Sequence, residues 1–195
     1  MSSRRSLLHV NTRQNSCAGR SVCQGLTLIE LIICVGMLAI LMGLAVPSFS
    51  TLLSGWRRDS AVNDFMGDLQ LARSTAIRTS RAVAMCVSSD ATTCDASPSR
   101  NDWRQGWIVF SDLDGNNTRN NNEPFIVQRG PVIGLQRMDS SIAQGRLVFR
   151  SNGLLNSGSN TVSILANGAS ATSLVGVRIT QAGRASLLKL GETSQ

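Results

Sequence analysis

Histidine is nearly absent from this sequence, because the chain of 195 residues has a single one, His9. Residues 26–195 contain none. A catalytic triad that uses histidine as its base and a zinc site with histidine ligands both need this side chain. Neither can be built from residues 26–195, so a membrane-anchored enzyme has little support in the sequence.

Acidic residues are missing from the first 25 positions, which carry Arg4, Arg5, Arg13 and Arg20. All twelve acids and fifteen of the nineteen bases lie in residues 26–195, so the net charge of that part is +3, against +7 for the whole chain. A basic flank before an apolar span stays on the cytoplasmic side of a membrane. We therefore expect the part that follows such a span to lie outside the cytoplasm.

Charge is almost absent from residues 26–46, where Glu30 is the one charged residue. As a helix this stretch would be roughly 30 Å long, which is the thickness of a bilayer's hydrocarbon core. We expect one membrane-spanning helix here. A carboxylate is costly in hydrocarbon, so Glu30 is expected to have a cationic partner.

The residues Gly25-Leu-Thr-Leu-Ile-Glu30 resemble the prepilin cleavage motif of type IV pilins and type II secretion pseudopilins. The resemblance implies that a prepilin peptidase removes residues 1–25 as a leader by cutting after Gly25, methylates the new N-terminus at Leu26 and leaves Glu30 in place. Leu26 stands where the family usually has phenylalanine. An ordinary signal anchor would explain the apolar run but not the spacing of Gly25 and Glu30.

Beyond Pro47 the apolar residues recur every three or four positions, which is typical of an amphipathic helix. They include Phe49, Leu52, Leu53, Trp56, Val62, Phe65, Met66, Leu69, Ala72 and Ala76. We expect one long helix from Leu26 to about Arg78, with a membrane half at 26–46 and an amphipathic half at 47–80 that packs on the following domain.

Residues 81–195 have short runs rich in Val, Ile and Phe, separated by turn signals such as Asp114-Gly115 and Asn167-Gly168. The pattern predicts strands at 82–87, 107–110, 125–127, 147–149, 161–165, 175–180 and 185–190. The predicted fold class is therefore α+β, with an antiparallel sheet domain built onto one long helix.

The cysteines are unevenly placed, since only Cys86 and Cys94 lie in the predicted sheet domain. In an oxidising compartment two cysteines that close a short loop indicate a disulfide. A zinc site needs more ligands than the domain offers, and a redox pair usually has the spacing Cys-x-x-Cys. We predict a Cys86–Cys94 disulfide.

The stretch Cys86-Val-Ser-Ser-Asp-Ala-Thr-Thr-Cys94, followed by Trp103-Arg-Gln-Gly-Trp107-Ile-Val-Phe-Ser-Asp112-Leu-Asp-Gly115, resembles the GspH/FimT family of minor pilins and pseudopilins. Trp103 and Trp107 are large apolar residues with a polar handle, so we interpret them as packing residues that pin a loop over the sheet.

The two resemblances imply a type IV pilin-like fold and a minor structural subunit without a cofactor, not an enzyme. Expected partners are other pilin or pseudopilin subunits, the prepilin peptidase and the inner membrane, with the sheet domain in the periplasm. Glu30 would neutralise the N-terminal amine of a neighbouring subunit during assembly. A type IV pilus of the FimT/FimU kind is the first interpretation, and a type II secretion pseudopilus of the GspH kind is the alternative.

Oxygen-bearing side chains alternate at Asp112, Asp114 and Asn116, and Glu123 falls at the twelfth position of an EF-hand-like loop. This spacing raises a calcium hypothesis. Asn117, however, stands where such a loop needs glycine, and the flanking segments are predicted as strands. Asp and Asn are also common in turns, so a hairpin turn is the preferred interpretation and no metal is predicted.

Acids are also missing between Asp139 and Glu192, while five bases fall there: Arg146, Arg150, Arg178, Arg184 and Lys189. Arginine suits bidentate phosphate contacts, so the region is a candidate DNA-binding surface. FimT-type competence pilins, which the sequence resembles, bind DNA through Gly-Arg-x-Arg, whereas this chain has Gly183-Arg184-Ala185-Ser186. Stacking aromatics are absent, and a solvated sheet face is the alternative.

Overall fold

The structure is a computed structural model that describes residues 27–95, 101–141 and 145–190. The chain forms two compact units, Met1–Gly43 and Leu44–Gln195. The predicted leader and both predicted processing residues, Gly25 and Leu26, lie outside the described residues.

Helix α1 (Leu28–Thr79) has a defined cap at each end. Thr27 Oγ1 accepts a hydrogen bond from the Glu30 amide at 3.3 Å, as the N-cap residue of a capping box does. At the other end Ser80 has a φ of 52°, the Ser80 amide donates to Ile77 O, and the Arg81 amide donates to Ala76 O. These are the two hydrogen bonds of a Schellman motif, which satisfies the last carbonyls and ends the helix.

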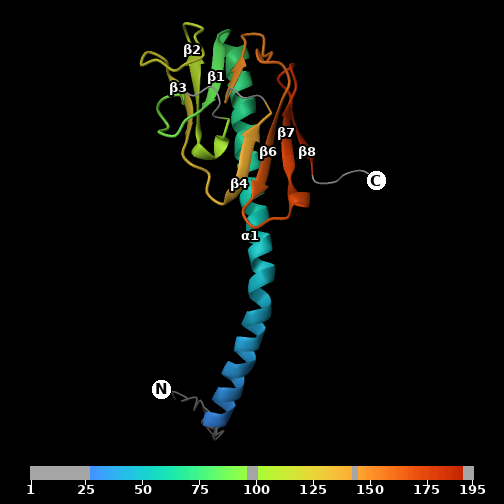
Figure 1. Cartoon of the computed structure of the whole chain (residues 1–195). Helices are drawn as coiled ribbons and strands as arrows, with labels where there is room; N and C mark the ends of the chain where they lie inside the picture. The colour runs from blue at the N-terminus through green and yellow to red at the C-terminus, as the bar shows by residue number, and fades with distance from the viewer. Residues whose placement is uncertain (1–26, 96–100, 142–144, 191–195) are drawn as a thin grey trace, which may run out of the picture. The chain divides into compact units, whose positions relative to one another are not determined.

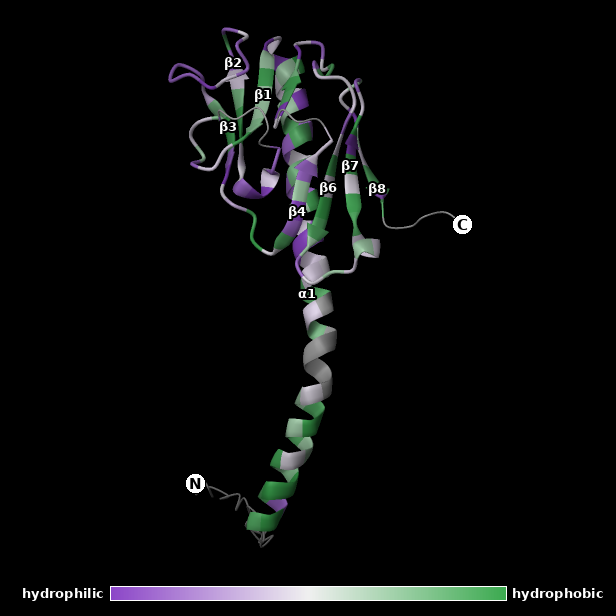
Figure 2. Cartoon of the chain, viewed as in Figure 1, coloured by the Kyte–Doolittle hydropathy of each residue, from purple (hydrophilic) through white to green (hydrophobic). Residues whose placement is uncertain are grey.

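In the first unit, the described side chains of α1 are exposed on all sides. Leu28, Ile29, Leu31, Ile32 and Ile33 are each more than half exposed, which leaves no buried face along consecutive turns. Figure 2 shows the apolar colouring that continues along this stretch. Within the described part of the chain, no helix reaches the length and apolarity that crossing a bilayer requires.

The second unit contains eight described strands in two antiparallel sheets (Figure 1). The first sheet has the order β3 (Phe125–Arg129), β2 (Trp107–Asp112), β1 (Ala82–Val87), β5 (Arg146–Phe149). The second has the order β4 (Leu135–Ser140), β6 (Asn160–Ala166), β7 (Val175–Ile179), β8 (Ala185–Lys189). Two short 3₁₀ helices, η1 (Trp103–Gln105) and η2 (Ala171–Ser173), precede β2 and β7.

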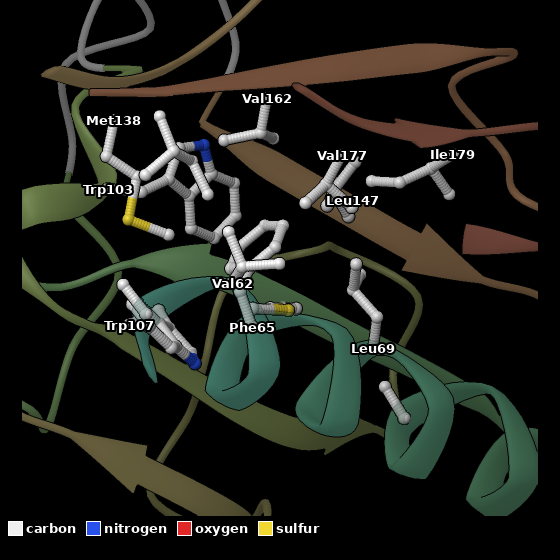
Figure 3. Close-up of a cluster of buried hydrophobic side chains, with 14 of the residues drawn as sticks. Val62, Phe65, Leu69, Trp103, Trp107, Met138, Leu147, Val162, Val177 and Ile179 are labelled. Atoms are coloured by element: carbon white, nitrogen blue, oxygen red, sulfur yellow. The ribbon is translucent and has the colours of Figure 1, made fainter. Parts of the chain in front are cut away.

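The main core lies between α1 and the inner faces of both sheets. The helix contributes one stripe of buried residues, at Ala61, Val62, Phe65, Leu69, Ala72 and Ala76. Phe65 is fully buried and meets the rings of Trp103 and Trp107 edge-on, at centroid distances of 5.1 and 5.4 Å (Figure 3). Met138, Val162 and Val177 join this cluster from the second sheet, so one helix face holds both sheets.

The first sheet is buried on its outer face as well. Ala84, Cys86, Ile108 and Phe110 form a second cluster with Cys94, which belongs to the loop after β1. β1 and β2 therefore carry buried residues on both faces, which explains why they are almost continuously apolar in sequence.

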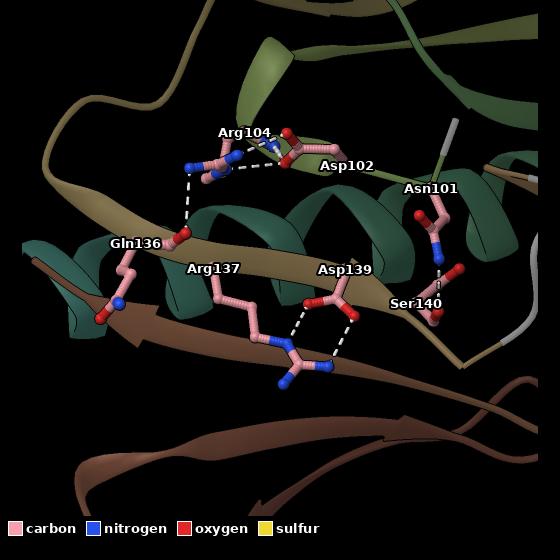
Figure 4. Close-up of polar contacts among 7 residues, drawn as sticks. All are labelled: Asn101, Asp102, Arg104, Gln136, Arg137, Asp139 and Ser140. Carbon is pink, nitrogen blue, oxygen red and sulfur yellow. Dashed lines mark hydrogen bonds and ion pairs between the residues drawn. The ribbon is translucent and has the colours of Figure 1, made fainter. Parts of the chain in front are cut away.

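Strand β4 is fastened to η1 by polar contacts (Figure 4). Arg104 Nη1 donates to Gln136 O at 2.9 Å, and the Arg104 side chain also pairs with Asp102. Asn101 Nδ2 donates to Ser140 O at 2.9 Å. These bonds cover the free edge of β4.

The α+β prediction is confirmed, and seven of the eight described strands were predicted. β4 was missed because its two buried apolar residues, Leu135 and Met138, are three positions apart instead of two. The pairing of β4 with β6 shifts register between Leu135 and Arg137, which accounts for that spacing. The amphipathic part of the helix was predicted to pack on the domain from residue 47. Among the described side chains, the first buried core residue of α1 is Ala61, whereas Phe49, Leu52 and Trp56 are 68, 61 and 72% exposed.

Candidate functional site

Glu30 lies in the first turn of α1, with its side chain exposed. Within the described residues, no ion pair is recorded for its carboxylate. An acidic residue in the first turn is favourable because the amides of that turn are unpaired and carry positive partial charge. The cationic partner expected for Glu30 from the sequence stays a prediction.

The predicted disulfide joins Cys86 on β1 to Cys94 in the following loop. Its sulfur atoms lie against the outer face of the first sheet, where Cys86 is 1% and Cys94 is 7% exposed. Gln128 Nε2 donates to Ala91 O at 2.7 Å, and Arg119 Nη1 donates to Thr92 O at 3.2 Å. The loop is thus held by the disulfide and by two neighbouring segments, and it covers the sheet.

Asp90 organises the tip of this loop. Its carboxylate accepts hydrogen bonds from the amides of Thr93 and Thr92, each at 2.8 Å, and from the Thr93 hydroxyl. The Thr93 amide is the largest of the causes that lower the pKa of Asp90 below its ordinary value. This carboxylate is therefore a stabilising group of the loop while it is ionised.

Trp103 and Trp107 are core residues, as their interpretation from the sequence indicated, with exposures of 0 and 1%. Trp107 also has a polar role that the sequence did not indicate. Its indole N–H donates to the buried carboxylate of Asp68 at 2.9 Å, and Arg129 donates to both oxygens of the same carboxylate. Asp68 comes from α1, and no local sequence signal connects it with residues 39 and 61 positions away.

The acidic residues considered for calcium do come together. Asp112, Asp114 and Glu123 each offer a carboxylate oxygen within 4.8 Å of the others, and Asp112 and Glu123 are buried. Asn117 occupies the loop position where an EF-hand has glycine, and it adopts a left-handed backbone conformation with a φ of 60°.

All three carboxylates already accept hydrogen bonds from their own loop. Glu123 accepts from the amides of Leu113 and Asn120, and Asp112 accepts from those of Gly115 and Asn117. Burial is the main cause that raises the pKa of Asp112. These bonds make a complete hairpin turn, and the preference for a turn over a calcium site stays a prediction.

The five bases considered for DNA lie in both sheets and in the turns beside them. Arg146 lies beside the acidic loop, where its Nη1 donates to Thr118 Oγ1 at 3.1 Å, and Arg150 Nε donates to Asn156 Oδ1 at 3.0 Å. Arg178 is exposed on the outer face of β7, between the buried residues Val177 and Ile179. Lys189 lines a hollow beside α1 instead. Arg178 and Lys189 therefore lie on different faces of the second sheet.

Arg184 shares a hollow with a residue that the sequence did not indicate. It lines a hollow of about 530 Å³ together with Arg73 of α1, and the hollow has no acidic residue in its lining. Arg73 Nε donates to Gly153 O at 3.3 Å. A Cβ atom on Gly183 would lie 2.4 Å from that same oxygen, so glycine is required for this close approach. Two arginines that are far apart in sequence thus line one hollow beside the β7–β8 turn.

Three solved structures of two proteins are similar to this chain, and the two with a TM-score of at least 0.50 define its fold as type IV pilin-like. A crystal structure of the type IV minor pilin FimU of Pseudomonas aeruginosa is 23% identical, with a TM-score of 0.53, covering 71% of this chain and 92% of that chain. A second crystal form of FimU is 24% identical, with a TM-score of 0.50, covering 70 and 97%. The minor pseudopilin EpsH of Vibrio cholerae is 16% identical, with a TM-score of 0.48, covering 70 and 99%.

A family model also matches more than half of the chain. The model of the family described as type II transport protein GspH matches residues 61–183. The chain belongs to the GspH family, and it is a structural subunit of the pilin and pseudopilin class rather than an enzyme. No curated protein sequence matches it.

Proposed function

We propose that this protein is a minor subunit of a type IV pilus that primes or caps the filament. One observation carries the proposal. The N-terminal part of α1 is apolar and exposed on all sides, whereas the part after Ala61 is fixed in the core of a pilin-like domain. Such a helix needs an apolar environment along its first turns. A membrane supplies that environment before assembly, and the packed helices of a filament supply it afterwards.

Processing and assembly would follow from the N-terminal residues. A prepilin peptidase would cut after Gly25 and methylate Leu26, and the protein would wait in the inner membrane as a single-pass protein with its sheet domain in the periplasm. Glu30 would then pair with the N-terminal amine of a neighbouring subunit. Such a pair is strengthened in the dry interior of a filament, because the dielectric constant there is low.

A type II secretion pseudopilus is the alternative machine, because the same N-terminal motif serves both systems. The Cys86–Cys94 loop and the spacing of Trp103 and Trp107 resemble those of FimT and FimU, and on this ground the pilus is placed first. Deletion of the gene separates the two. We expect loss of twitching motility or of transformation, with normal release of secreted proteins. Loss of protein release with normal twitching and transformation would assign the subunit to the secretion system.

DNA binding is a second candidate function, favoured by the hollow that Arg73 and Arg184 both line without an acidic residue. A gel-shift titration of the full chain in detergent, with duplex DNA at low and moderate salt, tests it. Replacing Arg184 with alanine should weaken binding. It should also reduce the slope of log affinity against log salt concentration by about 1, which corresponds to one lost phosphate contact. Replacing Arg178, which faces away on β7, is the matched control and should have less effect. Equal affinity of the Arg184→Ala variant and the unchanged protein at low salt would refute the role of the hollow.

A further inference from the structure

The loop between β3 and β4 carries the most exposed large apolar side chain that the structure describes. This residue is Ile133, at 85% exposure. The backbone beside it is held on both sides. The Val132 amide donates to Arg104 O at 2.9 Å, and the Asn167 amide donates to Gly134 O at 2.9 Å. The loop is therefore fixed to the domain while the Ile133 side chain stays outside the core.

This loop lies against α1. A Cβ atom on Gly134 would lie 2.6 Å from Cδ of Arg57, so the aliphatic part of that arginine packs on the backbone next to Ile133. Trp56 precedes Arg57 on the helix and is 72% exposed. We call Trp56, Arg57 and Ile133 the rim of the domain. The rim lies at the end of the second sheet where β4 begins and β6 ends (Figure 1).

The rim is positively charged. Arg57 is exposed, and within the described part of the chain no ion pair is recorded for its guanidinium group. The next residue, Arg58, pairs with Asp59 and adds no net charge. The neighbouring loop segments 130–134 and 167–174 contain no acidic residue. One uncompensated cation is thus combined with two large, exposed apolar side chains.

The length of the uncharged part of the chain places this rim at a bilayer surface. Residues 31–56 contain no charged side chain, so Arg57 is the first charge after Glu30. A helix over this stretch is about 40 Å long, which is the thickness of a bilayer with its headgroup layers. A bilayer that has Glu30 at one surface therefore has its other surface at Trp56 and Arg57. Tryptophan is enriched in that layer, and arginine reaches lipid phosphates from it.

We propose that the sheet domain docks on the periplasmic surface of the inner membrane through this rim, a contact that rests on the membrane state of the proposed function. Ile133 enters the boundary between headgroups and acyl chains beside Trp56, and Arg57 contacts a lipid phosphate. The occupant is therefore an anionic phospholipid surface. Because Ile133 belongs to a loop of the domain, this contact fixes the domain itself on the membrane before assembly.

The first test measures quenching of tryptophan fluorescence in the full chain, reconstituted in vesicles of phosphatidylethanolamine and phosphatidylglycerol. We expect lipids with bromine atoms near the headgroup to quench the emission more than lipids brominated near the bilayer centre. Trp103 and Trp107 are buried in the core, so Trp56 gives this signal. Trp56→Phe should therefore remove the quenching.

The deciding variant moves the tryptophan from the helix to the loop. Ile133→Trp in the Trp56→Phe background should restore quenching by the headgroup-proximal bromines. The matched control is Leu113→Trp in the same background, because Leu113 is 45% exposed and lies in the loop before β3, at the opposite end of that strand. It should add no quenching. Absence of quenching in the Ile133→Trp variant, or equal quenching in both variants, would overturn the proposal.

The charge of the rim is tested in the Ile133→Trp variant. Adding Arg57→Gln should lower the ratio of quenched to unquenched emission about fivefold, as expected for one basic residue at an anionic surface. Arg178→Gln, on the outer face of β7, is the control and should change this ratio by less than about twofold. Equal effects of the two changes would show that Arg57 makes no contact with lipid phosphate, contrary to the proposal.

The second test identifies the occupant directly. A photoreactive amino acid at position 133 of the full chain, in cells that contain the other subunits, should form adducts with phospholipid. Adducts with another subunit or with a second copy, without lipid adducts, would contradict the proposal. The quenching result also separates this proposal from the proposed function. If Trp56 is quenched and the Ile133→Trp variant is not, the membrane state holds and docking fails. If neither is quenched, the membrane state itself fails.

Discussion

The indole N–H of Trp107 donates to Asp68 Oδ2 at 2.9 Å, and this bond joins β2 to α1 inside the core. Arg129 of β3 adds two bonds to the same carboxylate, at 2.9 and 3.1 Å. The hydrogen bond that Arg129 donates to Asp68 is also the main cause that raises the pKa of Arg129. One acidic side chain therefore fixes the helix to two strands of the first sheet.

Replacing Asp68 with alanine should lower the free energy of unfolding by about 2 to 3 kcal/mol, since it leaves a buried indole N–H without an acceptor and removes bonds to a charged group. The matched control is Asp64→Ala, because Asp64 is half-exposed and lies 3.6 Å from the same arginine. That change should cost no more than about 0.5 kcal/mol. Denaturant titration of the full chain in detergent, followed by tryptophan fluorescence, measures both, and equal effects of the two variants would contradict the account.

Removal of the disulfide should destabilise the sheet domain. Cys86 and Cys94 are separated by eight positions, and a loop of that size corresponds to about 2 to 3 kcal/mol of stability. A Cys86→Ala, Cys94→Ala double variant should show this loss and faster proteolysis between residues 88 and 95. The exposed Cys34 serves as the control, since its change to serine should leave both measurements unaltered. If the double variant resisted denaturant and protease as the unchanged chain does, the loop would not depend on the bond.

The loop tip should also respond to acid. The pKa of Asp90 is lower in the folded chain than its ordinary value of 3.8, so the ionised group stabilises the fold above that value. This contribution is lost as the pH falls below about 3.8 toward the folded pKa. Asp90→Asn should lower stability at pH 7 and reduce the acid dependence between pH 4 and 2. If the free energy of unfolding of the variant and of the unchanged chain fell in parallel between pH 4 and 2, this prediction would be wrong.

Calcium titration decides between the two interpretations of residues 112–123. We expect no saturable heat at millimolar calcium, because the carboxylates of Asp112 and Glu123 are occupied by amides of their own loop. A saturable signal that disappears in Glu123→Gln would instead establish a metal site, since a glutamate at this position is the bidentate ligand of an EF-hand-like loop.

The fold was largely predictable because its elements have strong local patterns. Continuous apolar runs predicted β1 and β2. Alternation of apolar and polar residues predicted β6, whose residues are buried at every second position. The missed strand β4 has polar residues at four of its six positions, and its place in the sheet depends on pairing with β6 and on contacts with η1. The division into two sheets depends equally on pairing between distant segments, which no local pattern encodes.

The candidate sites were less predictable. Cys86 and Cys94 were paired correctly because only two cysteines were available in the domain. Asp68 and Arg73 were overlooked because each lies among ordinary helical residues and reaches Trp107 or Gly153 O only after folding. Charge counting placed five bases in one region, but Arg146 belongs to β5 of the other sheet, and alternation along β7 and β8 points Arg178 and Lys189 to different faces.

Filament incorporation of Glu30→Gln is the most direct test of the proposed function. Glutamine keeps the size of the side chain and removes its charge, so it should leave processing after Gly25 intact. Incorporation should fall at least about tenfold, because the pair with the neighbouring N-terminal amine is lost in a dry environment. Glu30→Asp, which keeps the charge, should assemble better than Glu30→Gln. If Glu30→Gln enters filaments as the unchanged protein does, Glu30 has no role in assembly and the account is wrong at its centre.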